Sequence, residues 1–131
     1  MRMSRSTGYG LLAVNYIAKQ KKDKIVLSNE ISKKYNIPRE YLLKIMQELA
    51  KADILRSKRG PRGGYSLARP ASKISMLDIV EAVEGSMNMS LGLDEHAPKN
   101  DKFAKNAENA YAKILDQTKA AYKKVKISNL L

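Results

Sequence analysis

The chain has 131 residues, 44% hydrophobic and 29% charged, a composition typical of one globular domain rather than of a disordered or low-complexity segment. It contains no cysteine, which excludes disulfides, thiolate-bound zinc and iron-sulfur clusters held by cysteine. The formal net charge of +12 favours a polyanionic partner, because side chains that neutralise phosphates release bound counterions.

The positive charge is concentrated in residues 1–80, which hold 17 Lys and Arg against 6 Asp and Glu. Residues 81–131 hold 8 against 7, so the candidate polyanion-binding part is the N-terminal one. Charge alone also fits a basic ribosomal protein or a membrane-surface protein. The apolar run at residues 11–14 is too short for a signal sequence or a membrane span, and we therefore expect a cytoplasmic protein without membrane contact.

Three helices are predicted in the first part of the chain. The first runs from an N-cap at Ser4 to about Lys19, with apolar residues at helical spacing on one face. A second is expected at 28–35 and a third at about 38–52, with Pro38 at its first position, where a missing N–H is tolerated. The buried side of the third helix is expected to consist of Leu42, Ile45, Met46 and Leu49. A packing helix followed by two helices and a tight turn is typical of a helix-turn-helix.

A β-hairpin and a further helix are predicted next. In residues 54–69, β-prone segments flank a tip rich in Gly and Pro, which indicates the hairpin. Ser75 is expected to begin the helix, which Asp78 supports in its first turn and Gly85 ends. Residues 86–100 lack periodicity, so we expect an irregular loop there.

A long helix is expected from about 101 to 126, with an apolar stripe whose members alternate at spacings of four and three. This spacing is found at the seam between paired helices. We interpret the stripe as a homodimer seam, because a long helix after a complete small domain has little else to cover it. Packing against the chain's own domain is the alternative. The stripe consists of Ala107, Tyr111, Ile114, Thr118, Ala121 and Val125.

The order helix, helix-turn-helix and hairpin is that of a winged helix, and the outward side of the third helix and the hairpin tip are both cationic. In such a protein the third helix enters the major groove, where side chains can distinguish all four base pairs. Arg59 and Arg62 at the tip suit the negative potential of a narrow minor groove. The sequence therefore predicts a binding site for double-stranded DNA.

The hairpin sequence Ser-Lys-Arg-Gly-Pro-Arg-Gly-Gly-Tyr-Ser-Leu-Ala-Arg at 57–69 resembles the wing signature of the Rrf2 family of bacterial winged-helix repressors. Members of this family include an iron-sulfur cluster regulator, a nitric-oxide-sensing repressor and a cysteine-metabolism repressor. Shorter matching segments follow in the family's order at 4–11, 37–42 and 77–85, and residues 127–131 resemble its closing segment. The resemblance is strong to residue 85 and looser beyond it.

The resemblance implies a mainly α fold with a small β-hairpin. Residues 1–85 would form a winged helix-turn-helix DNA-binding domain, with the helix-turn-helix at about 28–51 and the wing at 54–69. Residues 86–100 would be a loop, and 101–131 a dimerisation helix with a tail. The resemblance also implies a transcription repressor that binds an inverted-repeat operator as a homodimer.

Carried over by position, the resemblance implies three sets of DNA contacts. Phosphate contacts would fall on Arg5 and Ser28. Major-groove contacts would fall on Arg39, Glu40, Tyr41 and Lys44. Minor-groove contacts would fall on Arg59, Gly60, Pro61, Arg62 and Gly63. Each has an ordinary structural alternative, because the charges could be solvated, Tyr41 could belong to the core and the glycines could merely close a hairpin.

Two departures from the family limit which of its properties this chain is expected to share. Leu43 replaces a glutamate of the cluster-binding relatives, so their base preference is not transferred. Those relatives ligate a cluster with cysteines in the segment matching about 86–105, and this chain has none. His96, beside Asp94 and Glu95, is the one remnant of ligand chemistry, and a lone loop histidine is ordinarily a surface residue. We therefore expect no metal and no cofactor, with the signal delivered by a partner protein or a small-molecule effector.

Two other classes of function are alternatives to DNA binding. An enzyme is not expected, because the glycine-rich turn at 60–64 lacks the Gly-Lys-Ser/Thr ending of a phosphate-binding loop and no Ser/His/Asp arrangement is visible. A winged helix that binds RNA or another protein stays open as the alternative. Such a module would bind structured RNA about as well as duplex DNA. A protein that reads DNA with its third helix would not, because the deep major groove of A-form RNA excludes that helix.

Overall fold

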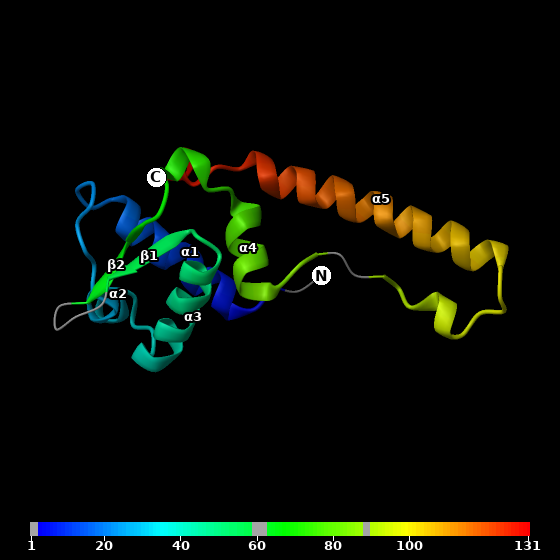
Figure 1. Ribbon diagram of the computed structural model, residues 1–131, viewed down its shortest axis with the longest axis horizontal. Coiled ribbons are helices and arrows are strands. Elements are labelled where there is room, and N and C mark those ends of the chain that lie inside the picture. Colours follow the sequence, from blue (N-terminus) through cyan, green and yellow to red (C-terminus); the bar gives the residue numbers. More distant parts are fainter. Residues whose placement is uncertain (1–2, 59–62, 88–89) are drawn as a thin grey trace.

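The computed structural model describes residues 3–58, 63–87 and 90–131, and begins with three packed helices (Figure 1). These are α1 (Arg5–Ala18), α2 (Ser28–Tyr35) and α3 (Arg39–Lys51). The predicted buried side of α3 packs into the core, where Leu42, Ile45, Met46 and Leu49 have at most 4% of their surface exposed. The three predicted helices are thus confirmed, with ends that differ by one residue.

A short turn joins α2 to α3. Asn36 has a φ of 54°, a left-handed conformation that ends α2, and Ile37 is buried beneath the turn. The Ser32 hydroxyl donates a 2.6 Å hydrogen bond to the Ile37 carbonyl. Pro38 is the N-cap of α3 rather than its first residue, which corrects its predicted position by one. The Pro38 carbonyl accepts the first helical hydrogen bond, from the N–H of Leu42 at 3.0 Å.

The predicted hairpin is present as β1 (Leu55–Lys58) and β2 (Gly64–Leu67), two antiparallel strands with Leu55 opposite Leu67. Its tip, residues 59–62, lies outside the described residues. The other edge of β2 pairs with Val26, through two 2.8 Å hydrogen bonds between the backbones of Val26 and Tyr65. The hairpin is therefore attached to the link between α1 and α2.

Gly64 lies where this link comes closest to β2. A Cβ at this position would be 2.7 Å from the carbonyl oxygen of Val26 and 2.7 Å from Cγ2 of Ile25. Both distances are shorter than a van der Waals contact, and the carbonyl belongs to a paired backbone that cannot turn aside. Glycine is required here by the close approach of two backbones, and not only by the turn of the hairpin.

Helix α4 (Met76–Glu84) begins and ends as the sequence predicts. The Asp78 N–H donates to Ser75 Oγ at 3.1 Å, and the Ser75 N–H donates to Asp78 Oδ2 at 2.8 Å. These reciprocal bonds form a capping box, which satisfies two backbone donors at the start of the helix. Gly85, with a φ of 94°, ends it.

The described part of residues 86–100 is irregular apart from one 3-10 turn, η2 (Leu93–Glu95). Asp101 then caps α5 (Lys102–Lys124), which starts far from the wing and runs back toward α4 (Figure 1). The carboxylate of Glu108 on α5 accepts hydrogen bonds from the N–H groups of Leu91 and Leu93, each at 3.1 Å. The loop is therefore fastened along the helix that follows it.

The far end of α5 is joined to the start of α4. The Met76 N–H donates to the Val125 carbonyl at 2.8 Å, and the Ile127 N–H donates to the Ile74 carbonyl at 2.9 Å. The side chain of Ile127 is buried in the core. No helix within the described ranges has both the length and the apolar character needed to cross a membrane.

The close approach at Gly64 leads to a prediction about stability. We expect Gly64→Ala to destabilise the fold by about 1–3 kcal/mol, because the added methyl group overlaps the Val26 carbonyl. Gly8→Ala is the matched control, since a Cβ at Gly8 meets nothing within 4 Å and helix α1 gains roughly 0.5–1 kcal/mol from alanine. Urea unfolding of both variants measures the difference. Equal stabilities would contradict the close approach.

Candidate nucleic-acid interface

The residues expected in the major groove lie in the first turns of α3. Arg39, Glu40, Tyr41 and Lys44 are all exposed; Glu40 and Lys44 lie opposite the buried stripe of this helix, and Arg39 and Tyr41 flank it. A helix buries one face when apolar residues recur every three or four positions, so the positions between them face outward. The structure thus brings these four predicted residues to one accessible helix end.

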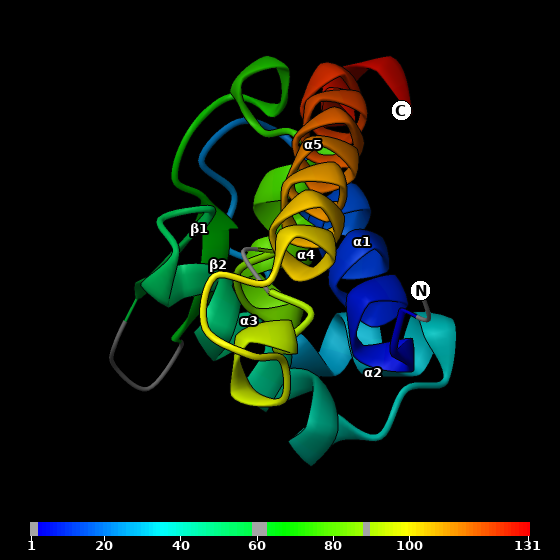
Figure 2. The same cartoon turned by 90° about the vertical axis from the view of Figure 1, so that its right-hand side faces the viewer.

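Tyr41 holds the start of α3 to the start of α1. Its ring packs edge-on against the ring of Tyr9, with 5.7 Å between the centroids, and its hydroxyl is hydrogen-bonded to the hydroxyl of Ser6. The side chain is still 42% exposed, so it is neither a core residue nor a free surface residue. In Figure 2 the first turn of α1 lies next to the segment that joins α2 and α3.

Glu84, at the end of α4, holds the start of α1 from the other side. The same carboxylate oxygen, Oε1, accepts hydrogen bonds from the Ser4 N–H at 2.8 Å, the Ser4 hydroxyl and the Thr7 hydroxyl at 2.6 Å. Ser4 does occupy the predicted N-cap position, but its side chain makes no cap hydrogen bond to α1 and donates to Glu84 instead. The expected capping mechanism is therefore wrong, and a carboxylate from a distant helix supplies the negative charge.

These contacts favour the ionised form of Glu84. Hydrogen bonds from the side chain of Ser4, from Thr7 and from the Ser4 backbone lower the pKa of the Glu84 carboxyl below its ordinary value. Partial burial opposes this shift. The ionised carboxylate therefore favours the folded state.

The two predicted phosphate contacts differ in accessibility. Arg5, the first residue of α1, is exposed and follows directly on the Ser4 contact with Glu84. Ser28, the first residue of α2, has only 8% of its surface exposed, so little of it is accessible to a phosphate. The structure brings Arg5 near α3, through the contacts of Tyr41 with α1, and leaves Ser28 below the surface.

Most of the predicted wing contacts lie outside the described residues. These are Arg59, Gly60, Pro61 and Arg62. Gly63 is described, and it is partly exposed just before β2. On β1, Arg56 and Lys58 are exposed, which adds cationic side chains to the wing that the site prediction omitted. Their spacing of two in the predicted strand could have indicated them, because side chains two positions apart in a strand point to the same face.

The predicted stripe on α5 lies beside the face that packs on the chain itself. Ala104 and Leu115 are the buried residues of this helix, whereas Ile114 is 57% exposed. Phe103, which the sequence prediction omitted, lies one turn before Ala107 and is 78% exposed. A shallow apolar groove follows the stripe and is lined by Met76, Ile114, Gln117, Thr118, Ala121, Tyr122 and Val125.

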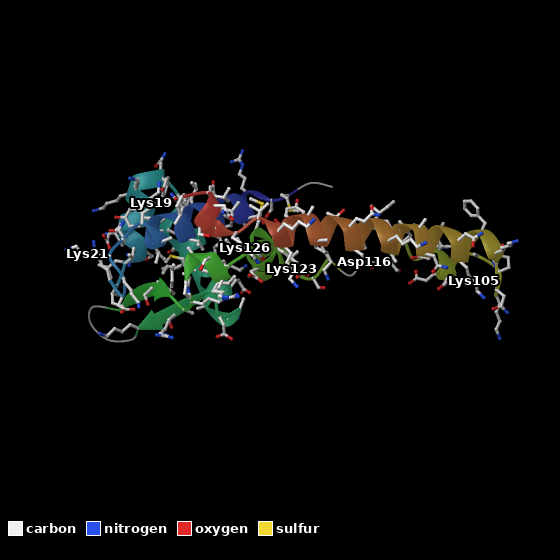
Figure 3. The ribbon with its side chains drawn as sticks, turned by 90° about the horizontal axis from the view of Figure 1, so that it is seen from above. Lys19, Lys21, Lys105, Asp116, Lys123 and Lys126 are labelled. Carbon is white, nitrogen blue, oxygen red and sulfur yellow. The ribbon has the colours of Figure 1, made fainter. Side chains whose placement is uncertain are left out.

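Charged residues occupy another side of α5. Figure 3 shows Lys105, Asp116 and Lys123 along the helix. At 100° per residue these positions lie opposite the stripe that contains Ile114. The long helix therefore has one face on its own chain, one apolar face open to the surroundings and one polar face.

The contacts of Glu84 predict a specific dependence of stability on pH. Because its pKa is lowered in the folded state, its contribution is present above the ordinary carboxyl pKa and disappears as the pH falls through the lowered value. We expect Glu84→Gln to be less stable than the parent protein at neutral pH, with the difference narrowing as the pH falls below the ordinary carboxyl pKa. Urea unfolding at neutral pH and at a series of acidic pH values measures this. Glu95→Gln, at an exposed loop position, is the control, and a Glu84→Gln deficit that does not change with pH would refute the role of the charge.

Comparison with known proteins identifies relatives that carry the names of transcriptional regulators. A protein of Aquifex aeolicus that carries the name of an HTH-type transcriptional regulator is 43% identical over 81 residues, 62% of this chain and 56% of that protein. The HTH-type transcriptional regulator IscR of Cereibacter sphaeroides is 37% identical over 90 residues, 67% of this chain and 58% of that protein. The chain thus matches little more than half the length of these relatives.

The whole fold has a counterpart among solved structures. The structure of CymR, the global cysteine regulator of B. subtilis, matches with a TM-score of 0.76 at 23% identity and covers 99% of this chain and 95% of that chain. The mainly helical architecture with a two-stranded hairpin and a long C-terminal helix is therefore confirmed as a winged-helix fold.

The Rrf2 family, described as iron-dependent transcriptional regulators, matches residues 3–131. The donors of this chain do not fit an iron-sulfur cluster held by cysteine, because it has no cysteine and a single histidine, His96. Within the described ranges, no group of three or more His, Cys, Asp or Glu side chains is placed to hold a metal ion. Regulators of this family bind DNA and are not enzymes. The resemblance inferred from the wing is confirmed, and the chain belongs to the Rrf2 family of transcriptional regulators.

Proposed function

We propose that this chain is a sequence-specific transcription repressor that binds an inverted-repeat operator as a homodimer, without an iron-sulfur cluster. The observation that carries the proposal is the exposed start of α3, which is fixed to α1 by Tyr41 and continues at its other end into the hairpin. A helix end and a hairpin attached to one rigid body can address two adjacent grooves of a duplex. Bound at an operator, the protein would block access of the transcription machinery.

In the major groove, the side chains at the start of α3 would read bases. Arg39 and Lys44 supply hydrogen-bond donors, and Glu40 supplies an acceptor, so both kinds of base edge can be recognised. Tyr41 would contribute mainly by orientation, because its hydroxyl is already bonded to Ser6. Arg5 would bind a phosphate beside the groove and fix the register of α3.

On the wing, charge supports contact with the minor groove and its phosphates. Exposed Arg56 and Lys58 lead along β1 toward the sequence Arg59-Gly60-Pro61-Arg62. Arginine is favoured where a narrowed minor groove concentrates negative potential. The Lys and Arg surplus of residues 1–80 supplies the sequence-independent part of the affinity.

Dimerisation would use the open apolar face of α5. We expect a second copy of this chain to cover this face. The stripe has the alternating spacing of paired helices and runs along a helix that projects from the domain (Figure 1). Two copies related by a two-fold axis would present two α3 helices, which matches an inverted repeat. The signal would reach the dimer through a partner protein or a small-molecule effector.

The proposal is tested by binding to the DNA upstream of the chain's own gene. At physiological salt we expect that duplex to bind at least about a thousandfold more tightly than a scrambled duplex of equal length. The protected half-sites should be separated by roughly one helical turn, about 34–36 Å. Equal binding to scrambled DNA would contradict sequence-specific repression, and equal binding to structured RNA would favour the RNA-binding alternative.

Wing variants refine this test. Arg59→Ala and Arg62→Ala should each weaken operator binding and reduce the slope of log affinity against log salt by about 0.9 for each phosphate that is no longer neutralised. Thermal unfolding should hardly change, because neither variant removes an apolar side chain from the core. A variant that unfolds instead would show that these residues have a structural role.

The dimer seam is tested on α5. Ile114→Asp should convert the dimer into a monomer, because it places a charge on the apolar face. Asn109→Asp adds the same charge on the polar side of the helix and should leave the dimer intact. Sedimentation equilibrium measures both. A dimer that survives Ile114→Asp would remove this face from the interface.

A further inference from the structure

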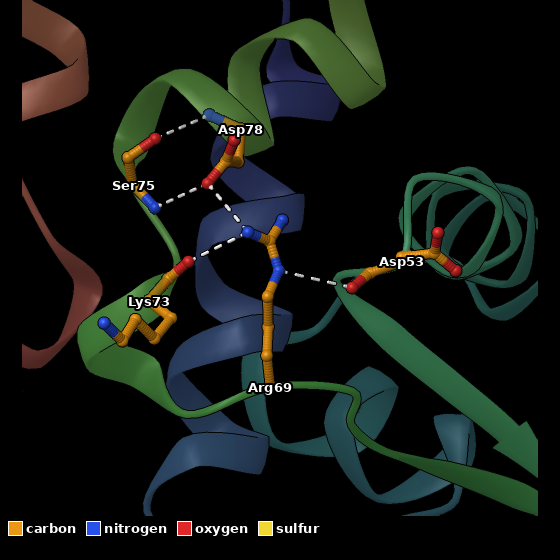
Figure 4. Close-up of polar contacts among 5 residues, drawn as sticks. All are labelled: Asp53, Arg69, Lys73, Ser75 and Asp78. Carbon is orange, nitrogen blue, oxygen red and sulfur yellow. Dashed lines mark hydrogen bonds and ion pairs between the residues drawn. The ribbon is translucent and has the colours of Figure 1, made fainter.

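Arg69 joins three parts of the fold at the base of the wing (Figure 4). Its Nε donates to the Asp53 carbonyl at 3.3 Å, and its Nη1 donates to the Lys73 carbonyl at 2.9 Å. The same Nη1 lies 3.5 Å from Oδ2 of Asp78, with which it forms an ion pair. One guanidinium therefore contacts the turn after α3, the 3-10 helix η1 (Ala71–Lys73) and the first turn of α4.

The first of these contacts closes the hairpin where it leaves α3. Asp53 lies in the turn between α3 and β1 and has a φ of 58°, while Arg69 comes two residues after the end of β2. Beside them the Ala68 N–H donates to the Ile54 carbonyl at 3.0 Å. The two ends of the hairpin are thus held together at the C-terminal end of the helix proposed to read bases.

The other contacts attach this closed base to a rigid partner. Oδ2 of Asp78, which faces Arg69, also accepts the Ser75 N–H at 2.8 Å in the capping box of α4. The carboxylate is therefore held in place, and α4 packs against both α1 and α3. Figure 4 shows the guanidinium between Asp78, the Lys73 carbonyl and the Asp53 carbonyl. A planar guanidinium offers several donors in fixed directions, which a lysine ammonium does not.

We propose that Arg69 is a positioning residue for DNA binding, which fixes the angle of the wing relative to α3. This inference rests on the proposed function. The side chain is 35% exposed and its Nε and Nη1 donors are engaged within the protein, so it acts through the geometry of the wing and not as a charge on a phosphate. Without these contacts of Arg69 the hairpin can tilt about its base, and α3 and the wing no longer fit their two grooves at once.

The deciding variant is Arg69→Lys, which keeps the charge and removes the planar guanidinium with its donors in fixed directions. We expect operator affinity to fall about tenfold, a decrease of the size of one poorly fitting base contact, while affinity for scrambled duplex is unchanged. The slope of log affinity against log salt should stay as in the parent protein, because the variant still neutralises the same phosphates. Hydroxyl-radical footprinting should lose the minor-groove protection by the wing and retain the protection by α3.

Lys105→Arg is the control, since it keeps the charge at an exposed position on the polar side of α5, outside the proposed DNA contacts. It should leave operator affinity and footprint unchanged. Thermal unfolding of both variants shows whether the fold persists. Should Arg69→Lys not fold, Asp78→Asn carries the test, because an amide oxygen can still accept the Ser75 N–H while the ion pair with Arg69 is removed. It should then show the same selective decrease at the operator.

Each outcome separates the two proposals. If Arg69→Lys leaves the operator affinity unchanged, the positioning role of Arg69 is wrong. A salt slope that Arg69→Gln reduces by about 0.9 would also overturn it, because that variant removes the charge and the loss would show that Arg69 binds a phosphate itself. If the parent protein does not distinguish its operator from scrambled duplex, the result contradicts the proposed function and not the positioning role of Arg69.

Discussion

Burial of one side of α3 is the constraint on which the proposed reading surface depends. Leu42, Ile45, Met46 and Leu49 occupy the core between α3 and the neighbouring helices. With 3.6 residues in each turn, the burial of these four side chains fixes the direction in which all the remaining positions of the helix point. Any change that rotates the buried stripe would turn Arg39 and Lys44 away from a duplex as well. The hydrophobic core and the chemistry of recognition are therefore coupled through one helix.

Polar contacts then restrict how this helix sits on the body of the protein. Glu84 holds the start of α1, Tyr41 connects α1 with α3, and Arg69 closes the base of the hairpin that follows α3. Individually, such contacts on partly exposed groups contribute modestly to stability. Their effect is on orientation, because each joins two elements whose relative angle matters for a ligand that spans both.

Features that depend on neighbours in sequence were predictable, and those that depend on distant neighbours were not. The buried stripe of α3 and the capping box of Ser75 and Asp78 follow from local spacing. The contact of Ser4 with Glu84 joins residues 80 positions apart, so no local pattern indicates it. The requirement for Gly64 comes from the backbone of Val26 on another segment, and the contacts of Arg69 reach three separate turns.

The pairing of β2 on both of its edges also limits how the small sheet can associate. β1 lies on one side of β2 and Val26 on the other, so the outer edge of β1 is the open edge of the hairpin. An open edge can template the addition of a strand from a second molecule, the first step of many aggregation processes. The exposed Arg56 and Lys58 on β1 oppose this, because two such edges would repel each other. The cations that suit a nucleic acid thus also protect the free protein from self-association through its wing.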